Sequence, residues 1–135
     1  DAGGVSAGWS FEDGWLPILD VLRNGQFFVT TGEVLIPRFT VGNRQSGEIL
    51  TLENNKPTAV HWELEWTFPL AYAEIISGDG QQTRRQRVDL AGTPAFGKNQ
   101  WTLDVDLTGQ RWVRLEVWDI ATNGAFTQPV WITPR

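Results

Sequence analysis

The clearest pattern along the chain is a strict alternation of apolar and polar side chains from Thr58 to Phe68. The apolar side chains occupy every second position: Val60, Trp62, Leu64, Trp66 and Phe68. Because side chains on a β-strand point alternately to the two faces of a sheet, this segment predicts one dry face and one wet face. The pattern recurs over 101–107 and 111–117, which favours an antiparallel sheet packed on a core along one side.

Further strands are predicted where β-branched and aromatic residues cluster between turn signals. Their ranges are 27–31, 34–41, 48–52, 71–77, 82–90, 101–107, 111–120 and 125–133. The strongest turn signal is Gly78-Asp79-Gly80, because glycine and aspartate tolerate the positive φ angles of a tight hairpin. The whole pattern predicts an all-β, immunoglobulin/fibronectin-like antiparallel β-sandwich of about seven or eight strands. A small barrel is the alternative architecture.

The first part of the chain has a different character. Residues 1–14 predict a linker or N-terminal arm that begins rich in glycine, alanine and serine. The apolar face of a short helix is then indicated by the spacing of Trp15, Ile18, Leu19 and Leu22 at i, i+3, i+4 and i+7. We therefore expect one helix over 15–24, leading into a single β-sandwich domain over 15–135.

Composition narrows the classes of function. A chain of 135 residues is long enough for one domain. Its net charge of −5 repels nucleic-acid phosphates and anionic lipid headgroups, so we expect no nucleic-acid binding and no membrane insertion. The absence of cysteine excludes disulfides and sulfur-ligated zinc. The absence of methionine leads us to expect that further residues precede Asp1.

Candidate chemistry begins with acidic groups on strands. His61, Glu63 and Glu65 share the wet face of one strand at a spacing of about 7 Å, and together they could ligate a divalent cation. A solvated sheet face is the favoured interpretation, because a closed metal site needs ligands from several elements and there is no second histidine. Asp104 and Asp106 are likewise interpreted as outward-facing surface charge rather than a desolvated acid pair.

Loops and hydroxyl groups provide no fuller site. Glu12-Asp13-Gly14 and Gly78-Asp79-Gly80 lack the ligand spacing of a calcium loop, and turn chemistry explains both. Thr30, Thr31 and Ser46 have no nearby histidine to activate a hydroxyl. We therefore expect no catalytic residue, no metal site and no cofactor in this chain.

A small basic cluster follows the predicted hairpin. Arg84, Arg85 and Arg87 could clamp a carboxylate or phosphate. The favoured interpretation is a sheet edge kept soluble and protected from sideways association by charge.

The eight tryptophans are the feature that ordinary surface chemistry does not explain. Alternation assigns Trp62, Trp66 and Trp101 to the core. It turns a second set of side chains outward: Trp112, Arg114, Glu116, Trp118 and Trp131. Exposed indoles suit protein docking or sugar stacking, because they bring large apolar area at little entropic cost. We expect these indoles to be covered by the N-terminal segment with its own aromatic side chains, by another domain, or by a glycan.

Two stretches of the sequence carry a family resemblance. The first is L-R-N-G-Q-F-F-V-T-T-G from Leu22 to Gly32, and the second is W-V-R-L-E-V-W-D from Trp112 to Asp119, followed by A-F-T-Q-P-V-W-I from 125 to 132. Together they resemble the C-terminal region of metallohydrolase-like proteins of the polymerase and histidinol phosphatase (PHP) superfamily. There, a phrase like the first closes the last helix of the catalytic barrel and enters a small β-domain. The resemblance extends over nearly all of residues 15–135.

The resemblance implies a non-catalytic accessory sandwich that belongs to a larger PHP-type hydrolase. In that family histidines and acids on the barrel hold the metal ions, and this chain has a single histidine, so no metal ligand is carried over. The implied partner is the catalytic domain of the same polypeptide, or another protein. The expected interface consists of Trp15, Ile18, Leu22, Trp112, Arg114 and Trp118.

A binding module of a different class is the alternative hypothesis. In a carbohydrate-binding module, Trp112, Trp118 or Trp131 would stack on a sugar ring. Arg114, Glu116 or Asp119 would form hydrogen bonds to its hydroxyls. A small self-sufficient hydrolase is the third and least favoured hypothesis.

Overall fold

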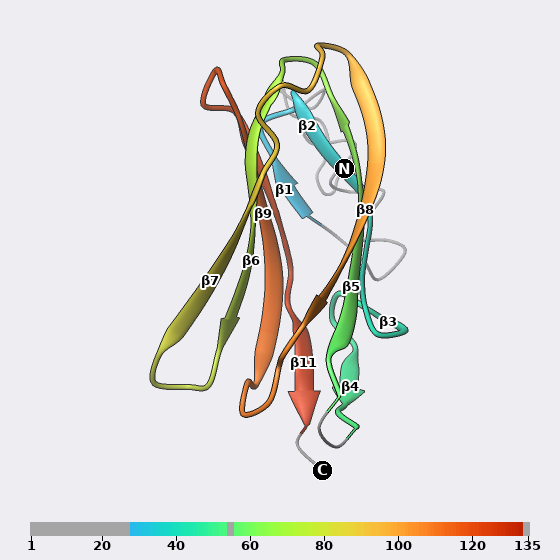
Figure 1. The fold of residues 1–135 in the computed structure, drawn as a ribbon, viewed down its shortest axis with the longest axis vertical. Helices are drawn as coiled ribbons and strands as arrows, with labels where there is room; N and C mark the ends of the chain where they lie inside the picture. The colour runs from blue at the N-terminus through green and yellow to red at the C-terminus, as the bar shows by residue number, and fades with distance from the viewer. Residues whose placement is uncertain (1–27, 54–55, 134–135) are drawn as a thin grey trace, which may run out of the picture.

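Two β-sheets stacked as layers make up the computed structural model, which describes residues 28–53 and 56–133 (Figure 1). The seven-stranded sheet consists of β1 (Phe28–Thr30), β4 (Ile49–Thr51), β6 (Leu70–Gly78), β7 (Thr83–Asp89), β9 (Trp112–Asp119), β10 (Gly124–Thr127) and β11 (Val130–Thr133). The four-stranded sheet consists of β2 (Val34–Val41), β3 (Arg44–Gln45), β5 (Thr58–Trp66) and β8 (Gly97–Val105). The prediction of an all-β protein is confirmed, while the predicted arm over 1–14 and helix over 15–24 lie outside the described residues.

Strand β9 is the centre of the seven-stranded sheet. Along one side it pairs antiparallel with β6, which in turn pairs with the edge strand β7. Along the other side it pairs first with β11 and then with β10. Strand β1 continues the sheet beyond β10, and β4 continues it beyond β11 in a parallel pairing. Strand β9 therefore joins every other part of this layer.

The four-stranded sheet runs in the order β3-β2-β5-β8. Strands β5 and β8 pair without interruption from Thr58 opposite Val105 to Trp66 opposite Gly97. The pairing of β2 with β5 shifts register between Leu35 and Arg38, in the part of β2 that contains Pro37. Because proline has no backbone N–H to donate, a bulge is a site in a sheet that tolerates it.

The core lies between the inner faces of the two sheets and is formed by aliphatic side chains around tryptophans. The predictions that Trp62 and Trp66 are core residues are confirmed, with 1% and 7% of their surface exposed. The indole of Trp101 stacks on Trp62 at a centroid distance of 6.1 Å and lies 6.1 Å from that of Trp66. The prediction that Trp101 is simply a core residue is wrong in degree, because its side chain packs against the core but is only partly buried. Among the described strands, β8 has a neighbour on one side only.

Two strand ends differ from the pattern read along the sequence. The alternating strand ends at Trp66, and Phe68 is 41% exposed in the turn that follows rather than inward-facing. The final predicted strand is divided into β10 and β11 at Gln128-Pro129. At this break the hydroxyl of Thr127 accepts the backbone N–H of Leu115 at 3.0 Å. The hydroxyl thus replaces a ladder hydrogen bond where β9 changes partner.

The predicted hairpin at 78–80 is confirmed and joins β6 to β7. The carboxylate of Asp79 accepts the backbone N–H groups of Gln81 and Gln82, each at 2.8 Å. These hydrogen bonds, that of Gln82 first, lower the pKa of Asp79 below its ordinary value. Asp79 therefore acts as a turn residue, with its oxygens directed to the backbone of its own loop.

Trp62→Ala is expected to lower the free energy of unfolding by about 3–5 kcal/mol, because it leaves a cavity in the closely packed core. Urea denaturation monitored by circular dichroism measures the change. Trp131→Ala is the control, since that indole is 45% exposed and its truncation leaves no internal cavity. Similar losses at the two positions would contradict the described core.

Candidate interaction surface

The outer face of the four-stranded sheet is polar. The ring Nδ1 of His61 is hydrogen-bonded to the Thr102 hydroxyl at 2.8 Å, and its Nε2 lies 3.6 Å from a carboxylate oxygen of Glu63. The same carboxylate oxygen lies 3.6 Å from Nε of Arg38. Within residues 28–53 and 56–133, no three His, Asp or Glu side chains form a group that could hold a metal ion. The candidate ligands His61 and Glu63 are instead neighbours in an ordinary polar row.

The other candidates for chemistry take part in local hydrogen bonds. Asp104 and Asp106 are both exposed, and Asp106 accepts the backbone N–H of Thr108 at 3.0 Å. The hydrogen bond from that N–H, together with one from the Thr108 side chain, lowers the pKa of Asp106. The Thr30 hydroxyl donates to the backbone carbonyl of Val34. These contacts are those of turns and strand ends.

The outer face of the seven-stranded sheet is different, and we call it the outer aromatic face. It consists of Val29 (β1), Ile49 (β4), Tyr72, Glu74 and Ile76 (β6), Arg85 and Arg87 (β7), Trp112, Arg114, Glu116 and Trp118 (β9), Phe126 (β10) and Trp131 (β11). The predicted outward set from β9 and β11 lies on this face. The predicted helix residues Trp15, Ile18 and Leu22 lie outside the described part of the chain.

Three tryptophans are paired in register with a glycine on the neighbouring strand. The pairs are Trp112 with Gly78, Trp118 with Gly124, and Trp66 with Gly97. A Cβ atom built on Gly78 would lie 2.5 Å from the Trp112 ring, and one on Gly124 would lie 2.6 Å from the Trp118 ring. The indoles therefore lie across the adjacent strands in space that only glycine leaves open. For this reason Trp112 and Trp118 are half-buried although they face outward.

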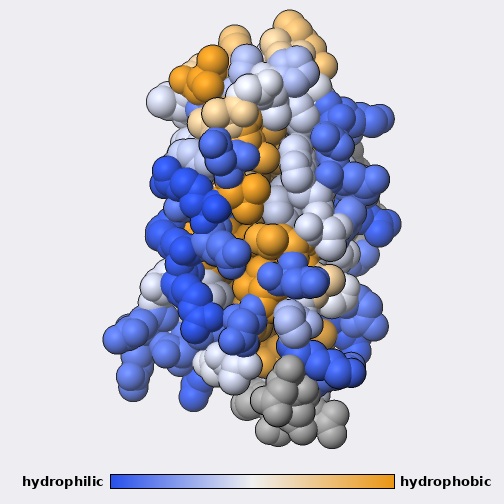
Figure 2. All heavy atoms as spheres, in the orientation of Figure 1, coloured by the Kyte–Doolittle hydropathy of each residue, from blue (hydrophilic) through white to orange (hydrophobic). Residues whose placement is uncertain are grey.

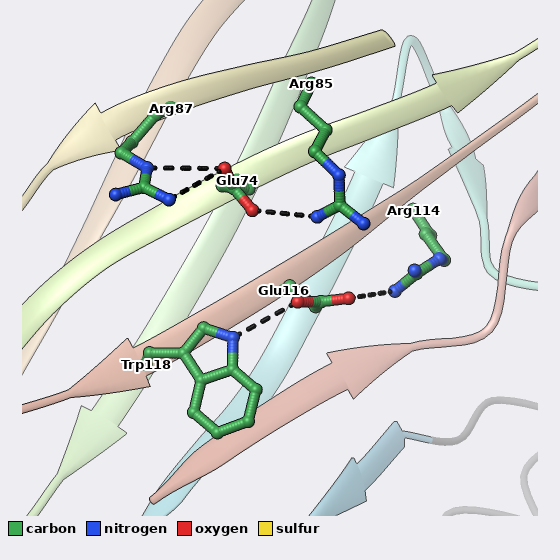
Figure 3. Close-up of polar contacts among 6 residues, drawn as sticks. All are labelled: Glu74, Arg85, Arg87, Arg114, Glu116 and Trp118. Carbon is green, nitrogen blue, oxygen red and sulfur yellow. Dashed lines mark hydrogen bonds and ion pairs between the residues drawn. The ribbon is translucent and has the colours of Figure 1, made fainter. Parts of the chain in front are cut away.

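The middle of the outer aromatic face holds a buried carboxylate between arginines (Figure 3). Glu74 is 6% exposed, and its two oxygens lie 2.9 Å from Nη1 of Arg85 and 3.2 Å from Nη2 of Arg87. The Arg87 guanidinium also lies over the ring of Tyr72, 3.7 Å from its centroid. Two arginines of the cluster after the hairpin, Arg85 and Arg87, thus clamp a carboxylate of their own chain, which satisfies an otherwise costly buried charge.

A second carboxylate lies directly beside the first. Glu116 is the register partner of Glu74, and it accepts hydrogen bonds from Arg114 at 2.9 Å and from the Trp118 indole N–H at 3.1 Å (Figure 3). Burial alone would raise the pKa of Glu116. The hydrogen bonds from Trp118 and Arg114, with the positive charges of Arg114 and Arg85, outweigh burial and hold that pKa below its ordinary value. The network therefore brings two facing carboxylates, Glu74 and Glu116, together with three guanidinium groups, those of Arg85, Arg87 and Arg114.

An apolar side chain is buried beneath this network. Ile76 lies in register between Arg85 and Arg114 on the outer face, and it is 0% exposed. A fully buried aliphatic side chain at an outward-facing position shows that this part of the face is closed to solvent.

Beside β9 the face becomes apolar and exposed. Val29 and Phe126 are 40% and 42% exposed, and they border a hollow of about 320 Å³. Its other lining residues are Arg114, Glu116, Thr127, Gln128 and Pro129. Farther along the same face, Trp131 is 45% and Ile49 60% exposed. Exposed apolar side chains grouped on one sheet face are typical of surfaces that contact a partner.

Sequence reasoning missed Val29, Phe126 and Ile49 as members of this face. Alternation along the short strands β1, β4 and β10 gave too few positions to assign a face, since these strands have three or four residues. Only their pairing with β9 and β11 brings them beside Trp112 and Trp118.

Comparisons with known proteins found no matching family model, no matching curated protein and no matching solved structure. In the part of the chain that the structure describes, there is no helix with the length and apolar character needed to cross a membrane.

Gly78→Ala is expected to destabilise the domain by about 1–3 kcal/mol, because the new methyl group displaces the Trp112 indole. Thermal or urea unfolding of four proteins measures it: wild type, each single variant, and Gly78→Ala with Trp112→Ala. In the Trp112→Ala background the alanine at 78 should be harmless or stabilising, since the obstructing ring is gone. An equal cost in both backgrounds would contradict the pairing.

Glu116→Gln is expected to reduce stability at neutral pH. A carboxyl group whose pKa is lowered on folding stabilises the folded state above its unfolded pKa of about 4.3, and this contribution disappears as the pH falls through the lowered folded value. The difference in unfolding free energy between wild type and variant should therefore be largest near neutral pH and shrink in acid. Urea unfolding over a pH series measures it, with Glu65→Gln on the polar outer face as the control. An identical pH dependence for both variants would contradict the role of Glu116.

Proposed function

We propose that this chain is a non-catalytic accessory β-sandwich domain that docks through its outer aromatic face onto a catalytic domain of the same polypeptide or another protein. The observation that carries the proposal is the contrast between the two outer faces. One is a polar surface, and the other combines exposed apolar side chains with a rigid network of charges. Large aromatic side chains beside arginines are the usual composition of the centre of a protein interface.

The order of the strands supports an immunoglobulin/fibronectin-like arrangement. With β2, β5 and β8 taken as strands A, B and E, the second sheet follows as C′ (β7), C (β6), F (β9) and G (β10 with β11). Immunoglobulin-type sandwiches divide their strands between two sheets in this way. On this proposal, no strand in the described part of the chain takes the place of strand D beside β8, and β4 pairs in parallel with the last strand.

The positions of the resembling stretches support the proposed kinship with PHP-type hydrolases. The described end of the first stretch contains β1, and the others form β9, β10 and β11. Strand β1 is far from these strands in the sequence but pairs with β10 in the seven-stranded sheet. On this proposal they form the side of the sandwich that meets the barrel, and the metal ligands belong to the barrel alone.

The experiment begins with the coding sequence upstream of Asp1, where we expect a barrel rich in histidine. That upstream part, produced separately, is titrated with this chain by isothermal calorimetry. Phe126→Asp should weaken binding at least tenfold, because it puts a charge in the apolar hollow. Glu65→Arg on the polar outer face should leave binding unchanged. No binding by the wild-type chain, or equal effects of both variants, would contradict docking through this face.

Carbohydrate binding is the second candidate, and the neighbouring indoles favour it. Trp131 is 45% exposed and is the register partner of Trp112 on β9. Two adjacent aromatic rings with charged groups nearby form a platform on which a sugar could stack. Titration with soluble oligosaccharides, followed by calorimetry, should give heat that is lost in Trp131→Ala if this function is correct. Heat that persists in that variant would contradict stacking on Trp131.

A further inference from the structure

The two open edges of the sandwich on one flank, β7 and β8, are protected very differently. An edge strand presents unpaired N–H and C=O groups and invites another strand unless charge, proline or a bulge prevents it. Strand β7 carries three arginines in its sequence T-R-R-Q-R-V-D. Strand β8, G-K-N-Q-W-T-L-D-V, has no proline, and its pairing with β5 has no register shift over nine residues.

The hydrogen-bond pattern tells which residues of β8 face the open edge. The N–H of Gly42, which follows β2, donates to the carbonyl of Ala59 at 2.8 Å. Backbone N–H and C=O groups of successive strand residues point to opposite neighbouring strands. Since Ala59 is hydrogen-bonded to the β2 side, the backbone groups of the odd-numbered residues of β5 point to β2, and those of the even-numbered residues point to β8. From the register of Trp62 opposite Trp101, the odd-numbered residues of β8 bond to β5. The N–H and C=O groups of Lys98, 100, 102 and 104 consequently point away from the sheet.

Two hydrogen bonds involve the backbone along this edge, one within the open row and one beyond its end. The Asn99 side chain accepts the Gln100 N–H at 2.8 Å, which provides that donor with a partner in place of a strand. Beyond the strand, Arg84 donates to the Asp106 carbonyl at 2.9 Å. Among the residues described, no strand pairs with β8 on this side. Within residues 28–53 and 56–133, β8 is therefore an edge strand along its whole length.

The flank beside β8 is also apolar. Figure 2, in the orientation of Figure 1, shows a strip of hydrophobic atoms running down the molecule between the hydrophilic β7 edge and the β8 edge. Partly buried side chains that belong to this flank are Val88 of β7 and Trp101 and Leu103 of β8. They point inward from edge strands, and no described strand lies between the two edges. A further strand beside β8 would cover this strip.

We propose that β8 pairs antiparallel with β8 of a second copy of this chain, about a two-fold axis at Trp101. This is the one register that matches every residue of Gly97–Val105 with another residue of the same strand. It brings Lys98 of each copy opposite Asp104 of the other, so two opposite-charge pairs form on the outer face. The pairing is isologous, as a two-fold dimer requires.

The chemistry at the axis agrees with this register. The backbone groups of Trp101 are directed to β5, so the two Trp101 residues meet at a site without mutual hydrogen bonds. Side chains are closest at such sites, with Cα atoms about 4.5 Å apart. Lys98 with Asp104 and Gln100 with Thr102 then form the hydrogen-bonded pairs. Each four-stranded sheet becomes half of one continuous sheet across the dimer.

The same operation on β7 is unfavourable. An antiparallel pairing of β7 with β7 of a second copy, about a two-fold axis at Gln86, places Arg85 of each copy opposite Arg87 of the other. Like charges directly opposite each other destabilise a strand pair. Charge therefore selects β8, rather than β7, as the edge for a second copy.

Sedimentation equilibrium of the full chain, up to about 1 mM, tests the proposal, because even a weak edge contact is populated there. We expect a dimer. Lys98→Asp or Asp104→Lys alone should weaken dimerisation about tenfold, since each puts like charges opposite one another twice. The double variant Lys98→Asp/Asp104→Lys should restore it. Lys56→Asp, which makes the same charge change in the segment before β5, is the control and should have no effect.

Gln100→Pro provides an independent test. It removes an outward N–H without removing a hydrogen bond to β5, so it should abolish the dimer while circular dichroism remains native. Hydrogen exchange at the outward amides of β8 should slow as protein concentration rises. A monomer at every concentration, a dimer that survives Gln100→Pro, or a double variant no better than the single ones would overturn the proposal. So would slow exchange at these amides in a monomer, because another part of the chain would then cover the edge.

Discussion

The packing of two inner sheet faces against each other is the interaction on which this domain depends. The chain has no cysteine for a disulfide, so its layers are joined by contacts between side chains. Trp62, Leu64 and Leu115 are almost completely buried between the layers. Because alternate positions of each strand are committed to this interior, the remaining positions are free to differ between the two outer surfaces. One outer surface is polar, and the other, the outer aromatic face, combines apolar and charged side chains.

The outer aromatic face is ordered by interactions of a different kind. Its two adjacent carboxylates, Glu74 and Glu116, are held by guanidinium groups, and the aliphatic Ile76 is buried next to them. Such a surface loses little conformational entropy when a partner covers it, because its side chains are already fixed. The face beside Phe126 adds the apolar area that association requires. The proposed docking role rests on this combination, and the proposed dimer edge at β8 leaves the face accessible.

Sequence periodicity predicted most strands and the faces of the longer ones, since side-chain direction follows from local spacing alone. The burial of Trp62 and the outward direction of Trp112 were both readable in this way. The partial exposure of Trp101 was not, because it depends on β8 being an edge strand. Likewise, the clamp on Glu74 and the exposure of Phe126 depend on which strands are neighbours and in what register. Pairing is a property of the whole fold and leaves little trace in any one segment.

The three pairs of tryptophan and glycine have a consequence for how such a sequence can evolve. Each indole occupies the volume that a side chain at the facing glycine would need, as at Trp112 and Gly78. A mutation that enlarges the glycine is therefore tolerated only after the tryptophan has become smaller, so the tryptophan has to change first. In related sequences, 78 and 112 should vary together, as should 124 and 118. Correlated substitution at these positions would identify distant homologues even where overall identity has been lost.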